Sequence, residues 1–288
     1  MANEPGRPAF LSQEIRNAML LYAVTDRAWL RGRTLADCVA EALRGGATFV
    51  QLREKEADDR ETAELARALM PLAHAAGVPF VIDDRVELAR AVGADGVHVG
   101  QSDAACADAR RILGPDAIVG LSAQTVEQAR AAQAAGADYL GVGAVFPTST
   151  KQDADSVSLA ELRDLCGAVD IPVVAIGGVN AQTAPKLAGC GVDGIAVVSA
   201  LFAQDDIEAA ARELVAAARR IVERPGGALR SDETGASMRA AGADDSLSPA
   251  QAAALEDLSQ HADASGLGTA ADFGAATRSA DAKGECAR

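Results

Sequence analysis

Aromatic residues are scarce in this 288-residue chain, which has one tryptophan, two tyrosines and six phenylalanines. Because aromatic residues make up only 3% of the sequence and apolar residues 49%, a core must be built mainly from alanine, valine, leucine and isoleucine. The length alone allows one large domain or two small ones.

Positive charge is also in short supply. The chain has 27 lysines and arginines against 41 aspartates and glutamates, so its formal net charge is -14. Nucleic acids and anionic membrane surfaces repel such a chain, and we expect neither as a partner. Phosphate groups would have to be bound by local features, such as backbone N–H groups, hydroxyls, a few cations or a bridging metal.

The cysteines lack the spacing of a metal site or a disulfide framework, and the sequence has no long apolar run. The five cysteines, an odd number, include no Cys-x-x-Cys pair, which argues against a disulfide framework or a zinc site and fits a reducing compartment. We find no apolar segment typical of a secretory signal and no run long enough to span a membrane. We therefore expect a cytoplasmic protein whose partners are small molecules, with room for a homo-oligomer.

A repeated strand-and-helix pattern is abundant instead. Eight apolar runs recur, each followed by a polar or glycine-containing loop and a stretch with helical spacing. The runs cover residues 19–26, 48–54, 79–83, 96–100, 117–122, 139–146, 171–178 and 194–199. They are continuous rather than alternating, which is typical of parallel strands buried on both faces. Eight such units predict an α/β protein with a (β/α)8 TIM barrel; a doubly wound open sheet is the alternative, although no Gly-x-Gly-x-x-Gly follows the first run.

The two ends of the chain differ from this pattern. We expect an N-terminal arm or short helix over residues 1–17 and the barrel over residues 18–223. Residues 224–288 are poor in valine and isoleucine and rich in small and polar residues, which predicts a mostly disordered tail. A short helix is expected near 248–260, because the sequence there begins with residues suited to an N-cap and a first helical turn.

Polar side chains follow the predicted strands, on the side where barrels of this kind carry their active sites. The second strand ends in the sequence QLREK (51–55), whose residues Gln51, Arg53 and Lys55 share one face. Two cations and an amide on one face suit the oxygens of a diphosphate. The alternatives are an ion-pair layer inside the barrel and a plain exposed strand end.

Three carboxylates follow the next two strands. Asp83 and Asp84 come after the third strand, and Asp103 comes after the fourth. Carboxylates without histidine or cysteine partners favour a hard cation, Mg²⁺ before Zn²⁺. The alternative for Asp84 and Asp103 is that each caps the helix that follows it.

Small and hydroxyl-bearing residues end the last three strands, in the segment 148–151 and at Gly178 and Ser199. Such residues allow backbone N–H groups to approach a phosphate after strands seven and eight. The alternatives are a solvated loop and a tight left-handed turn at Gly177 and Gly178. His98, inside the fourth apolar run, is expected to be a core histidine with satisfied hydrogen bonds, and no nucleophilic triad is visible.

Together these motifs resemble the thiamine phosphate synthase family. The similarity covers roughly Met19 to Leu214, and the pairing of PTSTK (147–151) with GQSD (100–103) is its most specific part. The resemblance implies a TIM-barrel transferase that joins an aminopyrimidine methyl diphosphate to a thiazole phosphate, releases pyrophosphate and depends on Mg²⁺. Loss of pyrophosphate before the new bond forms would make the reaction dissociative.

The resemblance also implies roles for individual residues. The catalytic residues would be Arg53, Lys151 and Ser122. The pyrimidine diphosphate would be bound by Gln51, Leu52, Arg53, Glu54, Lys55, Asp83, Ser122 and Lys151. The thiazole phosphate would be bound by Thr148, Ser149, Thr150, Gly178, Val198 and Ser199. Mg²⁺ would be bound by Asp84 and Asp103.

Two positions depart from the family pattern. Asp83 stands where the family usually has asparagine, and its extra carboxylate would repel a pyrophosphate unless it is protonated or metal-bound. Gln124 stands where the family often has histidine, which favours the synthase over a related thiazole tautomerase on the same barrel. That tautomerase and a non-catalytic phosphate-binding regulator remain the alternative functions.

Overall fold

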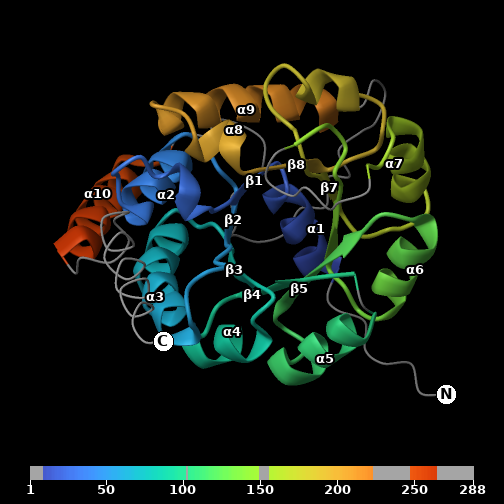
Figure 1. The fold of residues 1–288 in the computed structure, drawn as a ribbon, viewed down its shortest axis with the longest axis horizontal. Helices are drawn as coiled ribbons and strands as arrows, with labels where there is room; N and C mark the ends of the chain where they lie inside the picture. Colours follow the sequence, from blue (N-terminus) through green and yellow to red (C-terminus); the bar gives the residue numbers. More distant parts are fainter. Residues whose placement is uncertain (1–8, 102, 149–155, 223–246, 265–288) are drawn as a thin grey trace, which may run out of the picture.

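The chain forms a closed barrel of eight parallel strands surrounded by helices in the computed structural model (Figure 1). The structure describes residues 9–101, 103–148, 156–222 and 247–264. The strands are β1 (Leu21–Val24), β2 (Phe49–Leu52), β3 (Phe80–Asp83), β4 (Gly96–Val99), β5 (Ile118–Ala123), β6 (Tyr139–Val142), β7 (Val173–Ala175) and β8 (Gly194–Val197). Each strand pairs with its neighbours in the sequence, and β8 pairs with β1, so that Ala196 lies beside Tyr22. The predicted (β/α)8 barrel is confirmed, and the open sheet is excluded.

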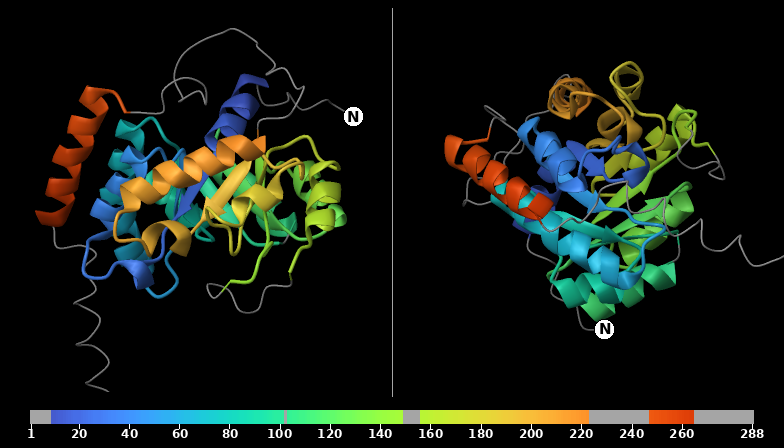
Figure 2. Two further views of the ribbon diagram at one scale, coloured as in Figure 1. Left: turned by 90° about the horizontal axis from the view of Figure 1, so that it is seen from above. Right: turned by 60° about the vertical axis from the view of Figure 1, so that its left-hand side comes forward.

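Helices surround the barrel, most of them on its outside and the first of them at its end (Figures 1 and 2). They are α1 (Ala9–Ala18), α2 (Leu35–Arg44), α3 (Asp59–Ala75), α4 (Val86–Val92), α5 (Asp103–Leu113), α6 (Val126–Ala134), α7 (Leu159–Cys166), α8 (Ser199–Phe202), α9 (Ile207–Val222) and α10 (Pro249–Ala264). The helices that the structure describes include none with the length and hydropathy that a membrane crossing requires.

The connection from β7 to β8 differs from the predicted alternation of strand and helix. It contains a short 3₁₀ turn, Ala184–Leu187, in place of an α-helix. The next residues include Gly189 and Gly191, which have φ angles of +77° and +89° and so cannot continue a helix. This turn packs against α9, which also contacts β8 and β1.

Two hydrophobic clusters explain why the strands are apolar on both faces. The outer cluster lies between the sheet and the helices and includes Leu43, Leu69 and Phe202. The inner cluster fills the barrel and includes Phe49 and Val174. Because a residue pointing either way from a strand meets a core, the runs contain no regular polar alternation.

Helix α1 closes the N-terminal end of the barrel. Ile15 and Ala18 of this helix, together with the adjacent Met19, join the inner cluster and are at most 5% exposed. Figure 1 shows α1 against the centre of the ring of strands, and the left view of Figure 2 shows it at one end of the barrel. The opposite end, where the strands finish, is thereby left for a binding site.

Helix α10 lies against α2 and α3 on the outside of the barrel (Figures 1 and 2). It begins after Ser248, which exchanges hydrogen bonds with Gln251 in the arrangement of a capping box. Leu255 is completely buried at the interface, and the Ser259 hydroxyl lies 2.6 Å from a carboxylate oxygen of Asp37 in α2. The helix is therefore a packed part of the folded chain. The remaining residues of the predicted tail lie outside the described part.

Replacing Leu255 by aspartate should weaken this packing. Burying a charge in place of a fully buried leucine is expected to lower the free energy of unfolding by about 2 kcal/mol and the Tm by about 4–8 °C. The matched control is Ala253→Asp, which adds the same charge to the exposed side of α10. Thermal unfolding that shifts equally in both variants would contradict the docking of α10.

Candidate active site

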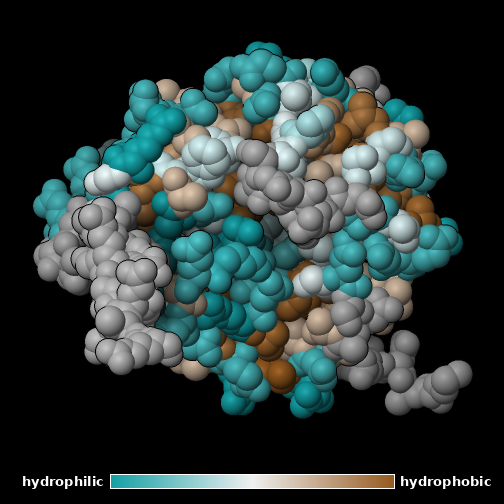
Figure 3. All heavy atoms as spheres, in the orientation of Figure 1, coloured by the Kyte–Doolittle hydropathy of each residue, from teal (hydrophilic) through white to brown (hydrophobic). Residues whose placement is uncertain are grey.

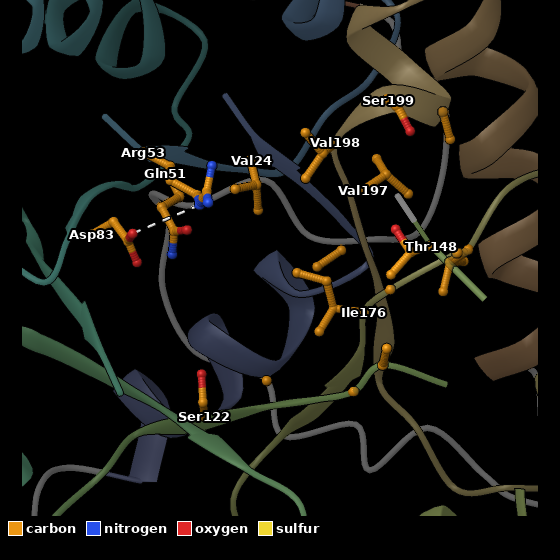
Figure 4. A pocket seen from close by; sticks show the side chains of 18 of the residues that line it. Val24, Gln51, Arg53, Asp83, Ser122, Thr148, Ile176, Val197, Val198 and Ser199 are labelled. Carbon is orange, nitrogen blue, oxygen red and sulfur yellow. Dashed lines mark ion pairs between the residues drawn. The ribbon is translucent and has the colours of Figure 1, made fainter. Parts of the chain in front are cut away.

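A cavity of about 660 Å³ opens at the end of the barrel where the strands finish. Its lining comes from the ends of β1 to β8 and from the loops that follow them. Hydrophilic residues lie near the centre of this face in the space-filling view (Figure 3), and Figure 4 shows the lining side chains from close by. The polar groups that the sequence places after separate strands therefore meet at one cavity.

The QLREK segment divides between the cavity and the barrel wall. Gln51, Arg53 and Lys55 line the cavity, whereas Leu52 and Glu54 do not. Leu52 is completely buried in the outer cluster, and the Glu54 carboxylate lies 2.5 Å from the guanidinium of Arg27. Side chains alternate along a strand, so Leu52 points away from the side that Gln51 faces, and Glu54 follows the same pattern beyond the end of β2. A direct side-chain contact with a ligand in the cavity is thus available to Gln51, Arg53 and Lys55.

The cations of this segment are paired with carboxylates. The Lys55 ammonium nitrogen lies 2.8 Å from an oxygen of Asp83 and 2.7 Å from one of Asp84. Arg53 lies 3.9 Å from Asp83 (dashed in Figure 4) and 3.5 Å from Asp26. Burial lowers the pKa of Lys55, but the hydrogen bonds and charges of the two aspartates raise it more, so its pKa lies above the ordinary value. Lys55 therefore stays charged, and both cations are paired with carboxylates before any anion arrives.

Asp84 does not cap the helix after β3, contrary to the alternative interpretation. The N-cap of α4 is Arg85, whose side chain makes no capping hydrogen bond. Asp84 has a φ of +60°, a left-handed conformation that aspartate tolerates better than most residues, and its N–H donates to the His98 carbonyl at 2.8 Å. Its carboxylate, 53% exposed, stands at the cavity beside Lys55. This backbone geometry turns the side chain toward the site.

Ser122 and His98 form a second polar region of the lining. The hydroxyl of Ser122, in β5, lies 3.0 Å from Nε2 of His98 in β4. The other ring nitrogen of His98 lies 3.1 Å from the hydroxyl of Tyr139. His98 therefore has the satisfied hydrogen bonds expected of a core histidine, and it also faces the cavity. The position of His98 inside an apolar run could not show whether it is only a core histidine or also faces the cavity.

The candidate phosphate corner is formed by Thr148, Gly178, Val198 and Ser199, which all line the cavity. Gly178 has a φ of +66°, and a Cβ atom there would lie 2.5 Å from the carbonyl oxygen of Pro147. Glycine is therefore required both by the left-handed turn and by the close approach of the two loops. Gly178 therefore forms the tight turn of the alternative interpretation and also lies at the predicted site.

Some predicted site residues fall outside the described part of the chain. These are Ser149, Thr150 and Lys151, directly after Thr148, and the side chain of Asp103 at the start of α5. Gln101, two residues before Asp103, lines the cavity. Within the described residues, no three His, Cys, Asp or Glu side chains are grouped as metal ligands usually are.

Apolar residues form much of the remaining lining and were missed by a search for polar motifs. Ile176 directly follows β7, Val197 ends β8, and Val24 ends β1 (Figure 4). Trp29, in the 3₁₀ turn Arg27–Trp29, also lines the cavity. The position of the single tryptophan in the loop that follows the first strand was a usable signal. These residues give the cavity an apolar wall suited to flat rings.

Gln124 lies outside the lining. Its amide nitrogen donates to the carbonyl of Gly143 at 3.2 Å, and its backbone N–H donates to the Gln128 side chain at 2.7 Å. The side chain therefore supports the loop after β6.

The chain is similar to proteins of known function. A family model described as thiamine monophosphate synthase matches residues 21–201. A thiamine-phosphate synthase of Ruminiclostridium cellulolyticum is 50% identical over 195 residues, which cover 68% of this chain and 93% of that protein. Another, from Clostridium tetani, is 47% identical over 194 residues, which cover 67% of this chain and 93% of that protein.

Solved structures give the same result. A thiamine phosphate pyrophosphorylase from Pyrococcus furiosus has 42% sequence identity and a TM-score of 0.66 over 72% of this chain and 98% of that one. KGPDC from Streptococcus mutans, at 15% identity and a TM-score of 0.51 over 70% of this chain and 98% of that one, shares the fold alone.

Removing the charge of Asp83 should strengthen anion binding. Asp83→Asn keeps the shape of the side chain but frees Lys55 and Arg53 from a competing carboxylate, so inorganic pyrophosphate should bind roughly five- to tenfold more tightly. Isothermal titration calorimetry measures the change. The control is Asp59→Asn, which removes the same charge from a surface pair with Arg85. Weaker binding to Asp83→Asn would mean that Asp83 positions Lys55 for the anion, contrary to this prediction.

Proposed function

Because this chain belongs to the thiamine monophosphate synthase family and is a transferase of that kind, we propose that it uses this cavity for an Mg²⁺-dependent, dissociative transfer. The substrates would be 4-amino-2-methyl-5-(diphosphooxymethyl)pyrimidine and a thiazole phosphate. The products would be thiamine phosphate and pyrophosphate.

One observation supports the proposal most strongly. A single cavity contains a cationic region, the candidate phosphate corner and an apolar wall. Arg53 and Ser199 lie on opposite sides of the cavity (Figure 4). Lys55, which adds a second cation, and Gly178, which adds a second small residue, also line it. Two phosphorylated substrates that react through their rings need this combination. A protein that binds a single phosphate would have no use for both regions.

The first step breaks the bond between the pyrimidine methylene carbon and the diphosphate oxygen. The electron pair leaves with pyrophosphate, and positive charge remains on the methylene and its ring. Arg53 and Lys55, together with Lys151, would stabilise the negative charge of the leaving group. Because Lys55 is already charged at the cavity, it gains no proton when this negative charge develops.

The second step forms the bond between the methylene carbon and the thiazole nitrogen. That nitrogen already has a lone pair, so no general base is required. Thr148, Gly178 and Ser199, with Ser149 and Thr150, would hold the thiazole phosphate so that the nitrogen faces the methylene, which is a positioning effect. The apolar residues Ile176 and Val197 would pack against the rings and exclude water from the reactive cation.

One carboxylate at the rim, that of Asp84, suits a magnesium ion. The Asp84 carboxylate is half-exposed and lies 2.7 Å from the Lys55 ammonium, so it already attracts a cation, and its oxygens suit a hard ion that keeps several waters. We propose that Asp84 and Asp103 bind Mg²⁺. When bound, the ion would supply positive charge to the oxygens of the diphosphate.

Pyrophosphate release tests the reaction directly. Mixing the protein with both substrates and Mg²⁺ should release one pyrophosphate for each thiamine phosphate formed, and omitting either substrate or adding EDTA should abolish release. Thiazole isomerisation without pyrophosphate release would indicate the tautomerase instead. Binding of both substrates without turnover would indicate the regulator.

Arg53→Ala should lower kcat by roughly a hundredfold, because one preorganised donor to the leaving group is lost. The control is Arg163→Ala, which removes an exposed arginine of α7 that does not line the cavity. Thermal unfolding would verify that both variants remain folded. A kcat within a few-fold of the parent enzyme for Arg53→Ala would contradict its proposed role.

A further inference from the structure

Five polar side chains form a continuous hydrogen-bonded chain beneath the cavity. The Gln51 amide nitrogen lies 2.7 Å from the Tyr22 hydroxyl, which lies 2.7 Å from the Tyr139 hydroxyl. His98 continues the chain, with Nδ1 3.1 Å from Tyr139 and Nε2 3.0 Å from Ser122. Gln51, His98 and Ser122 line the cavity, while the tyrosines are 2% and 0% exposed. The chain therefore starts and ends at the ligand surface and passes through the barrel core.

The packing around this chain holds its rings in place. A Cβ atom at Gly120 would lie 2.1 Å from the Tyr139 ring, and one at Gly141 would lie 3.2 Å from the His98 ring. The Phe49 ring centroid lies 4.5 and 5.5 Å from those of the two tyrosines. Two strand glycines thus make room for the ring groups, and the aromatic layer leaves them little freedom to turn away.

The number of protons fixes the direction of the hydrogen bonds. Burial raises the pKa of Tyr22 and of Tyr139 well above their usual range, so each phenol keeps its single proton. The Gln51 amide nitrogen donates to Tyr22. If the buried proton of each tyrosine is used within the chain, Tyr22 donates to Tyr139, and Tyr139 donates to Nδ1 of His98. His98 then carries its proton on Nε2 and donates it to Ser122. The opposite direction requires the Gln51 amide to flip and every bond to reverse.

We propose that Tyr22, Tyr139 and His98 act as positioning residues that make the site select an aminopyrimidine over the analogue with an oxo group in place of the amine. The chain turns the Ser122 hydroxyl proton toward the cavity as a donor and leaves the Gln51 carbonyl oxygen as an acceptor. An aminopyrimidine offers an amine donor and ring-nitrogen acceptors, which match this pattern. The inference rests on the proposed function, since the ring is that of the proposed substrate.

The oxo analogue presents the inverse pattern, a carbonyl acceptor next to a ring N–H donor. Binding it requires the whole chain to reverse or leaves buried polar groups unpaired. Either outcome weakens binding, because the donor and acceptor groups of the analogue do not match those of the site. Sites built around such hydrogen bonds discriminate strongly. Breaking the chain at one tyrosine should therefore relax the discrimination, because the two ends would no longer be coupled.

The ratio of kcat/KM for the amino and oxo diphosphates, measured by pyrophosphate release with the thiazole phosphate, tests the proposal. Tyr139→Phe removes one hydroxyl and keeps the ring, and it should lower the ratio roughly tenfold without changing the KM for the thiazole phosphate. Tyr22→Phe should act in the same way at the neighbouring link. The matched control, Phe49→Leu, loosens the same aromatic layer without breaking the chain and should leave the ratio unchanged.

An unchanged ratio in both tyrosine variants, with normal turnover by the parent enzyme, would overturn the positioning role and leave the proposed function intact. No turnover of the amino substrate by the parent enzyme would overturn the proposed function itself. ¹⁵N NMR of the parent enzyme, with His98 assigned by comparison with His98→Asn, provides a test that needs no folded tyrosine variant. We expect the proton on Nε2; a proton on Nδ1 would overturn the proposal.

Discussion

The pairing of β8 with β1 is the constraint on which the rest of the structure depends. It closes eight parallel strands into one ring, so all their carboxyl ends meet at a single rim. Helix α1 packs into the other end and leaves that rim as the open side. Residues more than 140 positions apart, such as Arg53 and Ser199, thereby line one cavity. In an open sheet the same residues would be spread along an edge.

Electrostatics explains how a chain with a net charge of -14 can present a site for anions. The cations at the rim are held by carboxylates, with Lys55 between Asp83 and Asp84. These pairs keep the cations charged and oriented, but they also compete with any incoming phosphate group. The site therefore balances preorganisation against affinity. A diphosphate, with several charged oxygens, can displace such internal partners more readily than a single carboxylate can.

The barrel was predictable from the sequence because its strands are buried on both faces and recur eight times. The position of the site was predictable too, since polar residues follow nearly every strand. The direction of individual side chains was not predictable from the motif alone. Leu52 and Glu54 belong to the QLREK motif, yet neither lines the cavity. The double role of His98 and the docking of α10, which lies beyond residues 21–201, depend on tertiary contacts that periodicity does not encode.

A crystal structure of the protein with Mg²⁺ and inorganic pyrophosphate would test the central claim most directly, because it locates the polyanion relative to the rim. The account predicts pyrophosphate oxygens within hydrogen-bonding distance of both Arg53 and Lys55, with Lys55 drawn away from Asp83. Pyrophosphate bound elsewhere on the protein, with the Lys55–Asp83 pair intact and Arg53 unoccupied, would contradict it.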